Sequence, residues 1–245
     1  MTIFLPVLFG GVVFGVAVPG YETPPGHFYN YVADCTLSPD YWPMIFSSEG
    51  VWGNYEMQGC TDEPLLLLNE PEQVEQANDT PTEGAALLYE WREWPGNVYC
   101  CGTQYGGPGW DWFGEMQTVY SDTYGLPLPI DGIHFHIYPA SVAALDTERL
   151  AQWRGLATEN SWELVVSEVG LLPVAGNTPD VIAEALPDLV HTVMGIVQPA
   201  ALFWFAWSVS PEANTPGIDW VNLSLYDENG VETVVGTAWN GLSCN

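Results

Sequence analysis

Two glutamates each close a short apolar run, and together they could divide acid and base chemistry. Glu70 ends the run 64–70, PLLLLNE, and Glu168 lies near the end of the run 163–169, ELVVSEV. A carboxylate at the end of a buried strand is costly unless something there requires it. Pro71 has no N–H and a fixed φ, so it would end the first strand without a ladder hydrogen bond. If both glutamates face one space, one can hold a proton while the other stays ionised.

The stretch IHFHIYP carries a second group of chemically capable residues. On a strand, His134, His136 and Tyr138 share one face because side chains alternate. Two histidines at this spacing can bind a metal, which gives the alternative of a metallohydrolase. Such a site needs further ligands, and the other histidines are badly placed: His27 starts a strand and His191 lies in a helical pattern. We therefore expect no metal, and we expect His134 to be a hydrogen-bonded core residue.

Eight apolar runs recur along the chain, and helical patterns separate the later ones. Runs of this length without polar alternation are typical of strands covered on both sides. Alternating strands and helices predict a parallel sheet, and eight strands in 245 residues predict an α/β protein with a (β/α)8 TIM barrel. The first three connections are too short or irregular for full helices, so helices should be short or missing in the first half. The strand runs are 12–19, 27–33, 41–47, 64–70, 98–104, 130–138, 163–169 and 201–208, and the helical patterns are 80–94, 110–125, 141–156 and 178–198.

The expected barrel positions both glutamates. Catalytic groups of such barrels lie at the C-terminal ends of the strands, and Glu70 and Glu168 would end the fourth and seventh strands. They would then face each other across the mouth of the barrel. Two other glutamates compete for the same roles. Glu163 lies at the wrong end of its strand, and Glu72, which follows the proline, should face solvent.

The charge of the chain limits its partners. There are 31 Asp and Glu residues against three Arg and no Lys, which gives a formal charge of −28. This charge repels nucleic-acid phosphates and anionic membrane surfaces, and it argues against acidic polysaccharides. A neutral substrate is the simplest match. We expect no nucleic acid, no membrane insertion of the mature domain, and a monomer. The acidity is alternatively a solubility device for a salty or acidic setting.

The N-terminal residues and the cysteines bear on export. Residues 1–19 are apolar but lack the positive n-region and the small-residue cleavage site of a signal peptide. We expect a leader or N-terminal extension over residues 1–10, one domain over 11–245, and a secreted or cell-surface protein. The five cysteines cannot all pair within the chain. If the protein is exported, the pair we expect is Cys35 with Cys60, both in candidate loops.

The strand-end motifs together resemble those of the clan A glycoside hydrolases: NEP ends the fourth strand, H-x-Y the sixth, and SE-x-G the seventh. The stretches FYNYVAD…YWPMIFS and LLLLNEPEQVEQANDTPTEGAALLYEW look more like the compact "glycosyl hydrolase catalytic core" proteins related to family 128 endo-β-1,3-glucanases. The resemblance covers most of the chain from about residue 12, although it does not account for the N-terminal apolar run.

This resemblance implies a retaining glycosidase that cleaves a neutral β-glucan without a cofactor. Glu70 would be the acid/base and Glu168 the nucleophile. Asn69 would hydrogen-bond the 2-hydroxyl of the sugar in the subsite being cleaved. Retaining enzymes hold their two carboxyls about 5 to 5.5 Å apart.

Side chains near the strand ends should contact the sugar, because aromatic rings stack on the apolar C–H faces of sugars. The resembled clan carries a tryptophan under the cleaved sugar on its last strand, which here is either Trp204 or Trp207. We expect His136 and Tyr138 to orient Glu168 or to touch the sugar. The remaining expected contacts, chosen by their positions at or after strand ends, are Trp110, Gln104, Tyr29 and Asn30, with Trp52, Trp112 and Tyr105 as further loop aromatics.

Three alternatives stay open. The protein could be a catalytically weak carbohydrate-binding barrel, which would keep the aromatic residues. It could hydrolyse another β-glycan, such as a β-1,4-glucan or a mannan. The remote alternative is the metal-dependent hydrolase that would use His134 and His136. Endo action on a β-1,3-glucan is implied by the resemblance alone.

Overall fold

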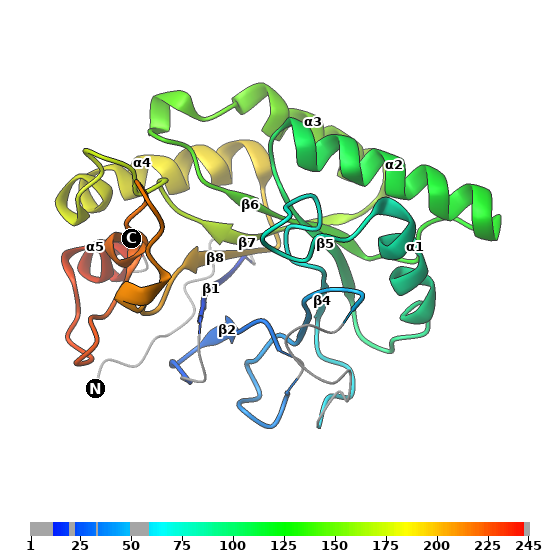
Figure 1. Ribbon diagram of the computed structural model, residues 1–245, viewed down its shortest axis with the longest axis horizontal. Helices are drawn as coiled ribbons and strands as arrows, with labels where there is room; N and C mark the ends of the chain where they lie inside the picture. Colours follow the sequence, from blue (N-terminus) through cyan, green and yellow to red (C-terminus); the bar gives the residue numbers. More distant parts are fainter. Residues whose placement is uncertain (1–11, 20–22, 33, 50–58, 243–245) are drawn as a thin grey trace. The chain divides into compact units, whose positions relative to one another are not determined.

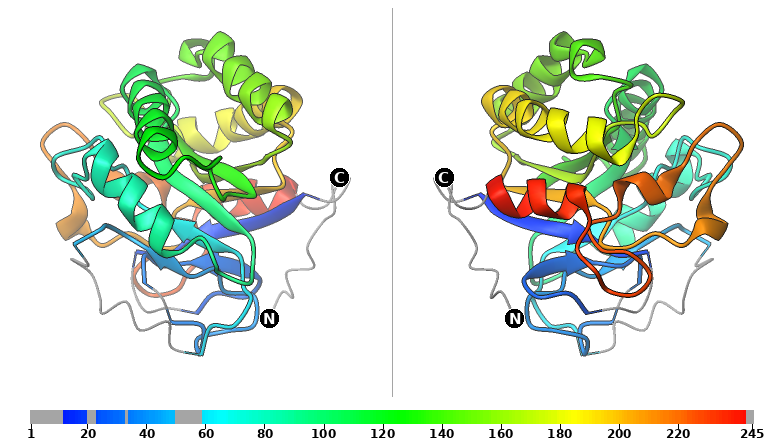
Figure 2. Two further views of the ribbon diagram at one scale, coloured as in Figure 1. Left: turned by 90° about the vertical axis from the view of Figure 1, so that its right-hand side faces the viewer. Right: turned by 90° about the vertical axis from the view of Figure 1, so that its left-hand side faces the viewer.

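The computed structural model describes residues 12–19, 23–32, 34–49 and 59–242 (Figures 1 and 2). The expected leader, residues 1–10, lies outside the described residues, as do Trp52 and Cys244. The chain divides into two compact units: one holds the chain up to Phe28, Ile137–Arg154 and the chain from Val166 on, and the other holds Tyr29–His136 and Gly155–Val165. That residues 11–245 act as one domain stays a prediction.

The strands follow one another in the order of a barrel. They are β1 (Val13–Ala17), β2 (His27–Tyr29), β3 (Met44–Ile45), β4 (Leu65–Leu67), β5 (Val98–Gln104), β6 (Gly132–Ile137), β7 (Glu163–Val169) and β8 (Ala201–Phe205). The sheet order is β2-β1-β8-β7-β6-β5-β4-β3, which is the cyclic succession of a (β/α)8 barrel with β2 and β3 as its end strands. The pairings of β1 with β8 and of β3, β4, β5 and β6 in turn are parallel. The predicted α/β class and barrel fold are confirmed.

Among the described residues, helices follow strands only from β4 onward, as the irregular early connections predicted. The helices are α1 (Pro81–Glu90), α2 (Gly107–Tyr124), α3 (Thr147–Asn160), α4 (Pro179–Val197) and α5 (Val234–Leu242), with short 3-10 helices η1 (Val142–Ala144), η2 (Pro211–Ala213) and η3 (Trp220–Leu223). None of the helices in the described residues is both long and apolar enough to cross a membrane.

In the unit that contains Tyr29–His136, α1 lies beside α2, and α2 packs on β5 (Figure 1). A capping box starts α1: Glu83 N–H donates to Thr80 Oγ1 at 3.3 Å, and Thr80 N–H donates to Glu83 Oε2 at 2.8 Å. Gly84 lets the two helices approach, because a Cβ there would lie 2.6 Å from Cη2 of Trp112. The indole N–H of Trp112 donates to Asp79 O at 2.8 Å, so Trp112 is a packing residue.

In the other unit, β1 pairs with β8 and α4 packs against α5 (Figure 2). Gly15 of β1 lies opposite Phe203 of β8, and a Cβ at Gly15 would lie 2.5 Å from the Phe203 ring. The glycine therefore makes room for the large rings of β8. Trp204 packs against Trp239 of α5, with ring centroids 5.6 Å apart.

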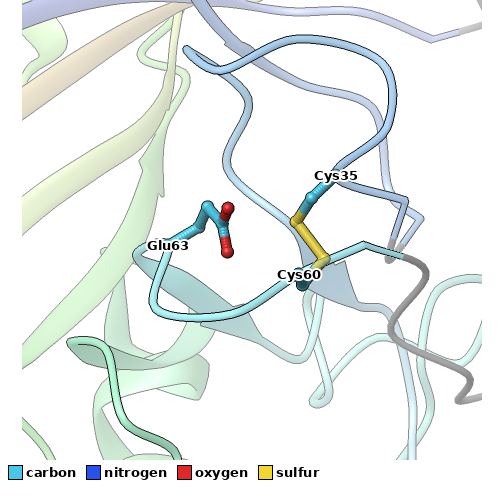
Figure 3. Close-up of side chains that lie close together, drawn as sticks. All are labelled: Cys35, Cys60 and Glu63. Atoms are coloured by element: carbon cyan, nitrogen blue, oxygen red, sulfur yellow. A yellow bond between two sulfur atoms is a disulfide. The ribbon is translucent and has the colours of Figure 1, made fainter.

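Two disulfides occur among the described residues. Cys35 and Cys60 are joined, with their Cα atoms 4.9 Å apart, which confirms the expected pair (Figure 3). The neighbouring Glu63 has a structural role, since its Oε2 accepts from Thr61 N–H at 2.6 Å. The adjacent Cys100 and Cys101 of β5 are also joined.

Candidate active site

The segment after β4 carries the first candidate glutamate on an irregular backbone. The strand ends at Leu67 rather than at Glu70, because Leu68 and Glu70 have left-handed φ angles of 68° and 46°. Such angles are uncommon in residues with a side chain and cluster at functional sites. Backbone bonds to neighbouring strands nevertheless fix the segment: Leu68 N–H donates to Ile45 O at 2.7 Å, Asn69 N–H to Phe46 O at 3.0 Å, and Glu70 N–H to Gly102 O at 2.9 Å.

Gly102 of β5 allows the segment to lie this close. Its φ is +64°, and a Cβ there would collide with Leu68 O, lie 2.8 Å from His134 Cε1 and lie 3.2 Å from Asn69 Cα. Glycine adopts this conformation without strain and leaves the space free. Gly102 therefore sets how closely the end of β4 approaches β5.

Glu70 is paired with a histidine of β6. Its Oε1 lies 2.9 Å from Nδ1 of His136, whose side chain is fully buried, whereas the side chain of Glu70 keeps 12% of its surface exposed. A bond between a carboxyl and an imidazole contains one proton, which either partner can hold. Because Glu70 is bonded to a proton carrier and also reaches solvent, it can give a proton to a bound molecule and take one back.

Asn69 presents an unpaired polar atom beside Glu70. The residue is buried, and its Nδ2 donates to Gln76 Oε1 at 3.2 Å. Within the described part of the chain, Oδ1 is buried and has no hydrogen-bond partner. An unpaired buried oxygen costs about 1–3 kcal/mol. A ligand hydroxyl that donated to Oδ1 would remove that cost.

Glu72 does not face solvent, and this prediction was wrong. Its Oε1 accepts a hydrogen bond from Gln104 N–H at 2.7 Å, and its Oε2 is buried without a partner among the described residues. Burial raises the pKa of Glu72, as does the neighbouring Glu70, whereas the Gln104 N–H and His136 act in the opposite direction. The expectation failed because the left-handed backbone at Leu68 and Glu70 redirects the chain.

His134 is a core residue, as predicted. Its Nε2 lies 2.8 Å from Leu67 O. A carbonyl oxygen only accepts, so Nε2 carries the proton. Burial lowers the pKa of His134 from 6.5 to about 3, so the ring is neutral at ordinary pH.

Glu163, the other candidate on β7, lies at the start of the strand and is hydrogen-bonded there. Its Oε2 accepts from the Tyr99 hydroxyl at 2.6 Å. Burial raises the pKa of Tyr99, and the bond to Glu163 raises it further, so Tyr99 remains a donor. Glu163 is thus at the other end of its strand from Glu168, where the sequence placed it.

In the other unit, Glu168 lies near the end of β7 and is 5% exposed. Tyr138, the first residue after β6, donates its hydroxyl to Glu168 Oε2 at 2.5 Å. A donated O–H to a carboxylate is a strong bond that fixes the orientation of the carboxylate. Of the two residues expected to orient Glu168, Tyr138 makes this bond, and the bond of His136 goes to Glu70.

The Tyr138 ring belongs to an aromatic cluster that the sequence did not reveal. Trp220 of η3 meets Tyr138 edge-on with centroids 5.5 Å apart, and Phe205 at the end of β8 meets both rings. Trp220 is partly exposed. Like Trp110, Trp220 is an aromatic residue in a segment that follows a strand, so its position in the sequence was a usable signal.

Burial separates the expected sugar contacts into two groups. Trp204 has no exposed surface, and its indole N–H donates to Leu223 O at 2.9 Å, so it is a packing residue here. Tyr29 is also fully buried, and Oδ1 of the buried Asn30 accepts from Tyr41 OH at 2.6 Å. The partly exposed residues are Trp207, which lies over Tyr226 with centroids 4.1 Å apart, Trp110 in the first turn of α2, and Gln104 at the end of β5.

No protein-family model matches the sequence, and no curated protein matches it. Among solved structures, an endo-β-1,3-glucanase of glycoside hydrolase family 128, subgroup I, from Amycolatopsis mediterranei in complex with laminarihexaose is 19% identical, with a TM-score of 0.67 and coverage of 93% of this chain and 98% of that chain. The subgroup II endo-β-1,3-glucanase from Pseudomonas viridiflava is 19% identical, with a TM-score of 0.69 and coverage of 92% and 96%. A subgroup VI exo-β-1,3-glucanase from Aureobasidium namibiae is 15% identical, with a TM-score of 0.65 and coverage of 89% and 86%. The chain is thus similar in fold to family 128 structures over most of its length.

Proposed function

We propose that the protein is a retaining glycoside hydrolase that cleaves a neutral β-glucan, with Glu70 as the acid/base and Glu168 as the nucleophile. The carrying observation is that the H-x-Y motif bonds both glutamates: His136 bonds Glu70 and Tyr138 bonds Glu168. A retaining mechanism requires the two carboxyls to be about 5 to 5.5 Å apart, and this spacing is part of the proposal.

Each residue then has a defined step. In the first step a carboxylate oxygen of Glu168 attacks the anomeric carbon, and Glu70 gives its proton to the departing glycosidic oxygen. In the second step Glu70 takes a proton from water as the water oxygen displaces Glu168 from the same carbon. Both steps invert that carbon, so the product keeps the β-configuration. Asn69 Oδ1 is available to accept a hydrogen bond from the sugar 2-hydroxyl.

The substrate class rests on the structural neighbours and on charge. The neighbours of similar fold are named as β-1,3-glucanases, and one of them was solved with laminarihexaose. A charge of −28 suits a neutral glucan better than an acidic one. Endo action on a β-1,3-glucan is therefore the specificity that we propose, with a β-1,4-glucan or a mannan as the alternative.

A catalytically weak sugar-binding barrel is the second candidate, and the inward-turned Glu72 argues against it. Glu70 and His136 are bonded to each other and Glu72 interacts electrostatically with both, and three coupled ionisable groups are more than sugar binding requires. The metallohydrolase is disfavoured by the ligands themselves. Nε2 of His134 is bonded to Leu67 O. Among the described residues, the group of possible metal ligands is Cys35, Cys60 and Glu63, and its two sulfurs are bonded to each other (Figure 3).

Secretion and a monomeric state are parts of the proposal. The Cys35–Cys60 disulfide supports an oxidising compartment, because structural disulfides persist there. The test of the activity is to incubate the purified protein with laminarin, cellulose, xylan and mannan, with and without EDTA, and to measure reducing ends. The proposal expects release from laminarin that EDTA does not reduce. Binding of laminarin without release would favour the sugar-binding barrel.

A further inference from the structure

We propose that Glu72 is a positioning residue that controls the charge and orientation of the Glu70–His136 pair, an inference that rests on the proposed function of that site. Glu72 comes two residues after Glu70, and its carboxylate is bound to the backbone of β5 by Gln104 N–H at 2.7 Å. It does not need to touch the substrate to act. It acts on the two groups that exchange the proton.

The end of β5 serves as a common support for the three groups. Gly102 O accepts from Glu70 N–H at 2.9 Å, and Tyr105 N–H donates to His136 O at 3.0 Å. Between these two bonds lies the Gln104 N–H that binds the Glu72 side chain. Three residues at the end of β5, Gly102, Gln104 and Tyr105, thus bond Glu70, Glu72 and His136. The position of Glu72 is therefore tied to that of the pair.

The charges around Glu72 give it an influence on the pair. The titratable groups that act on it are Glu70 from its own segment and His136 from β6, while β5 contributes the Gln104 N–H. Burial lowers the pKa of His134, the next histidine on the same face of β6, and His136 lowers it further, so His134 adds no charge to the group. Because Oε2 of Glu72 is buried without a partner among the described residues, a negative charge on this carboxylate would act on its neighbours with little screening by water.

A negative charge on Glu72 has two effects on its neighbours. It repels a negative charge on the neighbouring Glu70 and attracts a positive charge on His136. Both interactions favour keeping a proton in the Glu70–His136 bond, and the first step of glycoside cleavage uses that proton.

The test compares Glu72→Gln with the parent. Glutamine has the same shape and keeps an oxygen for Gln104 N–H, but it has no charge. The alkaline limb of the kcat/KM profile on laminarin should move to lower pH, and the titration midpoint of the His136 ring, followed by NMR, should also move to lower pH. Glu72→Ala should in addition lose about 10- to 100-fold in kcat/KM. Alanine removes the hydrogen bond to Gln104 N–H, so the segment that carries Glu70 is no longer bound to the end of β5 at this point.

The control is Glu75→Gln, which removes one exposed carboxylate from the same loop. Its pH profile and the midpoint of His136 should match those of the parent. If Glu72→Gln leaves the midpoint of His136 unchanged, the inference is wrong even in an active enzyme. If the parent has no activity on any glycan while the midpoint still moves, the proposed function fails and the coupling stands.

Discussion

His136 Nδ1 lies 2.9 Å from Oε1 of Glu70, which couples a candidate acid/base to a fully buried imidazole. Two residues further along the chain, Tyr138 bonds Glu168 in the same manner. A single H-x-Y motif thus serves both candidate catalytic glutamates.

Replacing Gly102 by alanine should displace Asn69 and Glu70. Both the left-handed φ of +64° and the close Leu68 O oppose a Cβ at this position. Gly125 is a matched control, because its φ is +65° and its Cβ would meet nothing within 4 Å. Each variant should lose about 1 kcal/mol of unfolding free energy from the backbone angle. Only Gly102→Ala should also lose about 100-fold in kcat/KM on laminarin. Equal activities of the two variants would contradict the packing role of Gly102.

If Glu70 is the acid/base, as proposed, its replacement by alanine should reduce activity on some substrates much more than on others. Cleavage of laminarin should fall by about 10²–10⁴-fold, because its leaving group needs a proton. An aryl β-glucoside with a good leaving group needs little acid help, so a burst of the aryl product should precede a slow steady state. Stopped-flow absorbance measures both phases. Equal losses on the two substrates would assign the acid role elsewhere.

The buried His134 should make the protein sensitive to acid. Its pKa falls from 6.5 in the unfolded chain to about 3 in the folded protein. The unfolded state therefore binds one more proton between these values, and stability present above pH 6.5 is lost as the pH falls toward 3. His134→Gln keeps an N–H for Leu67 O and removes the titration. Its unfolding free energy should fall less steeply on acidification, by up to about 1.4 kcal/mol per pH unit.

The control for this slope is the exposed His191 of α4. Urea unfolding at several pH values should show that the unfolding free energy depends on pH in the same way for His191→Gln and for the parent. A parallel set of curves for all three proteins would show that His134 is not held neutral in the fold.

The net charge predicts stabilisation by salt. With 31 carboxyl side chains against three arginines, the folded chain repels itself. Raising NaCl from about 0.01 M to about 1 M shortens the Debye length from roughly 30 Å to roughly 3 Å. At pH 7 the Tm should therefore rise by roughly 5 °C or more. Near pH 4, where many carboxyls are protonated, the rise should be much smaller, and an equal rise at both pH values would contradict the electrostatic cause.

The order of the strands could be predicted because short buried runs follow one another along the sequence, whereas the end of β4 at Leu67 could not. The apolar runs before Glu70 and Glu168, the capping box at Thr80 and the Cys35–Cys60 pair follow from local pattern and were confirmed in the structure. The position of Glu72 was not predictable from alternation. Two left-handed residues precede it, and neither Leu68 nor Glu70 belongs to a type that signals that conformation.

The expected tryptophan on the last strand shows a second limit of sequence reasoning. Trp204 and Trp207 are both near the end of β8, and nothing in their spacing says which ring is enclosed. The structure buries Trp204 between Leu223 O and Trp239, which leaves Trp207 partly exposed. The role of Trp220 depends on the path of a long loop after β8, which residue types alone do not specify.

The most direct test of the account is to trap the covalent intermediate and locate it. The protein would be incubated with a 2-deoxy-2-fluoro β-glucosyl donor that has a good leaving group, digested with pepsin because it contains only three arginines, and mapped by mass spectrometry. The account predicts one fluoroglucosyl group on Glu168, since in the proposed mechanism that carboxylate attacks the anomeric carbon. A label on another residue, or turnover of laminarin with an inverted product and no label, would contradict it.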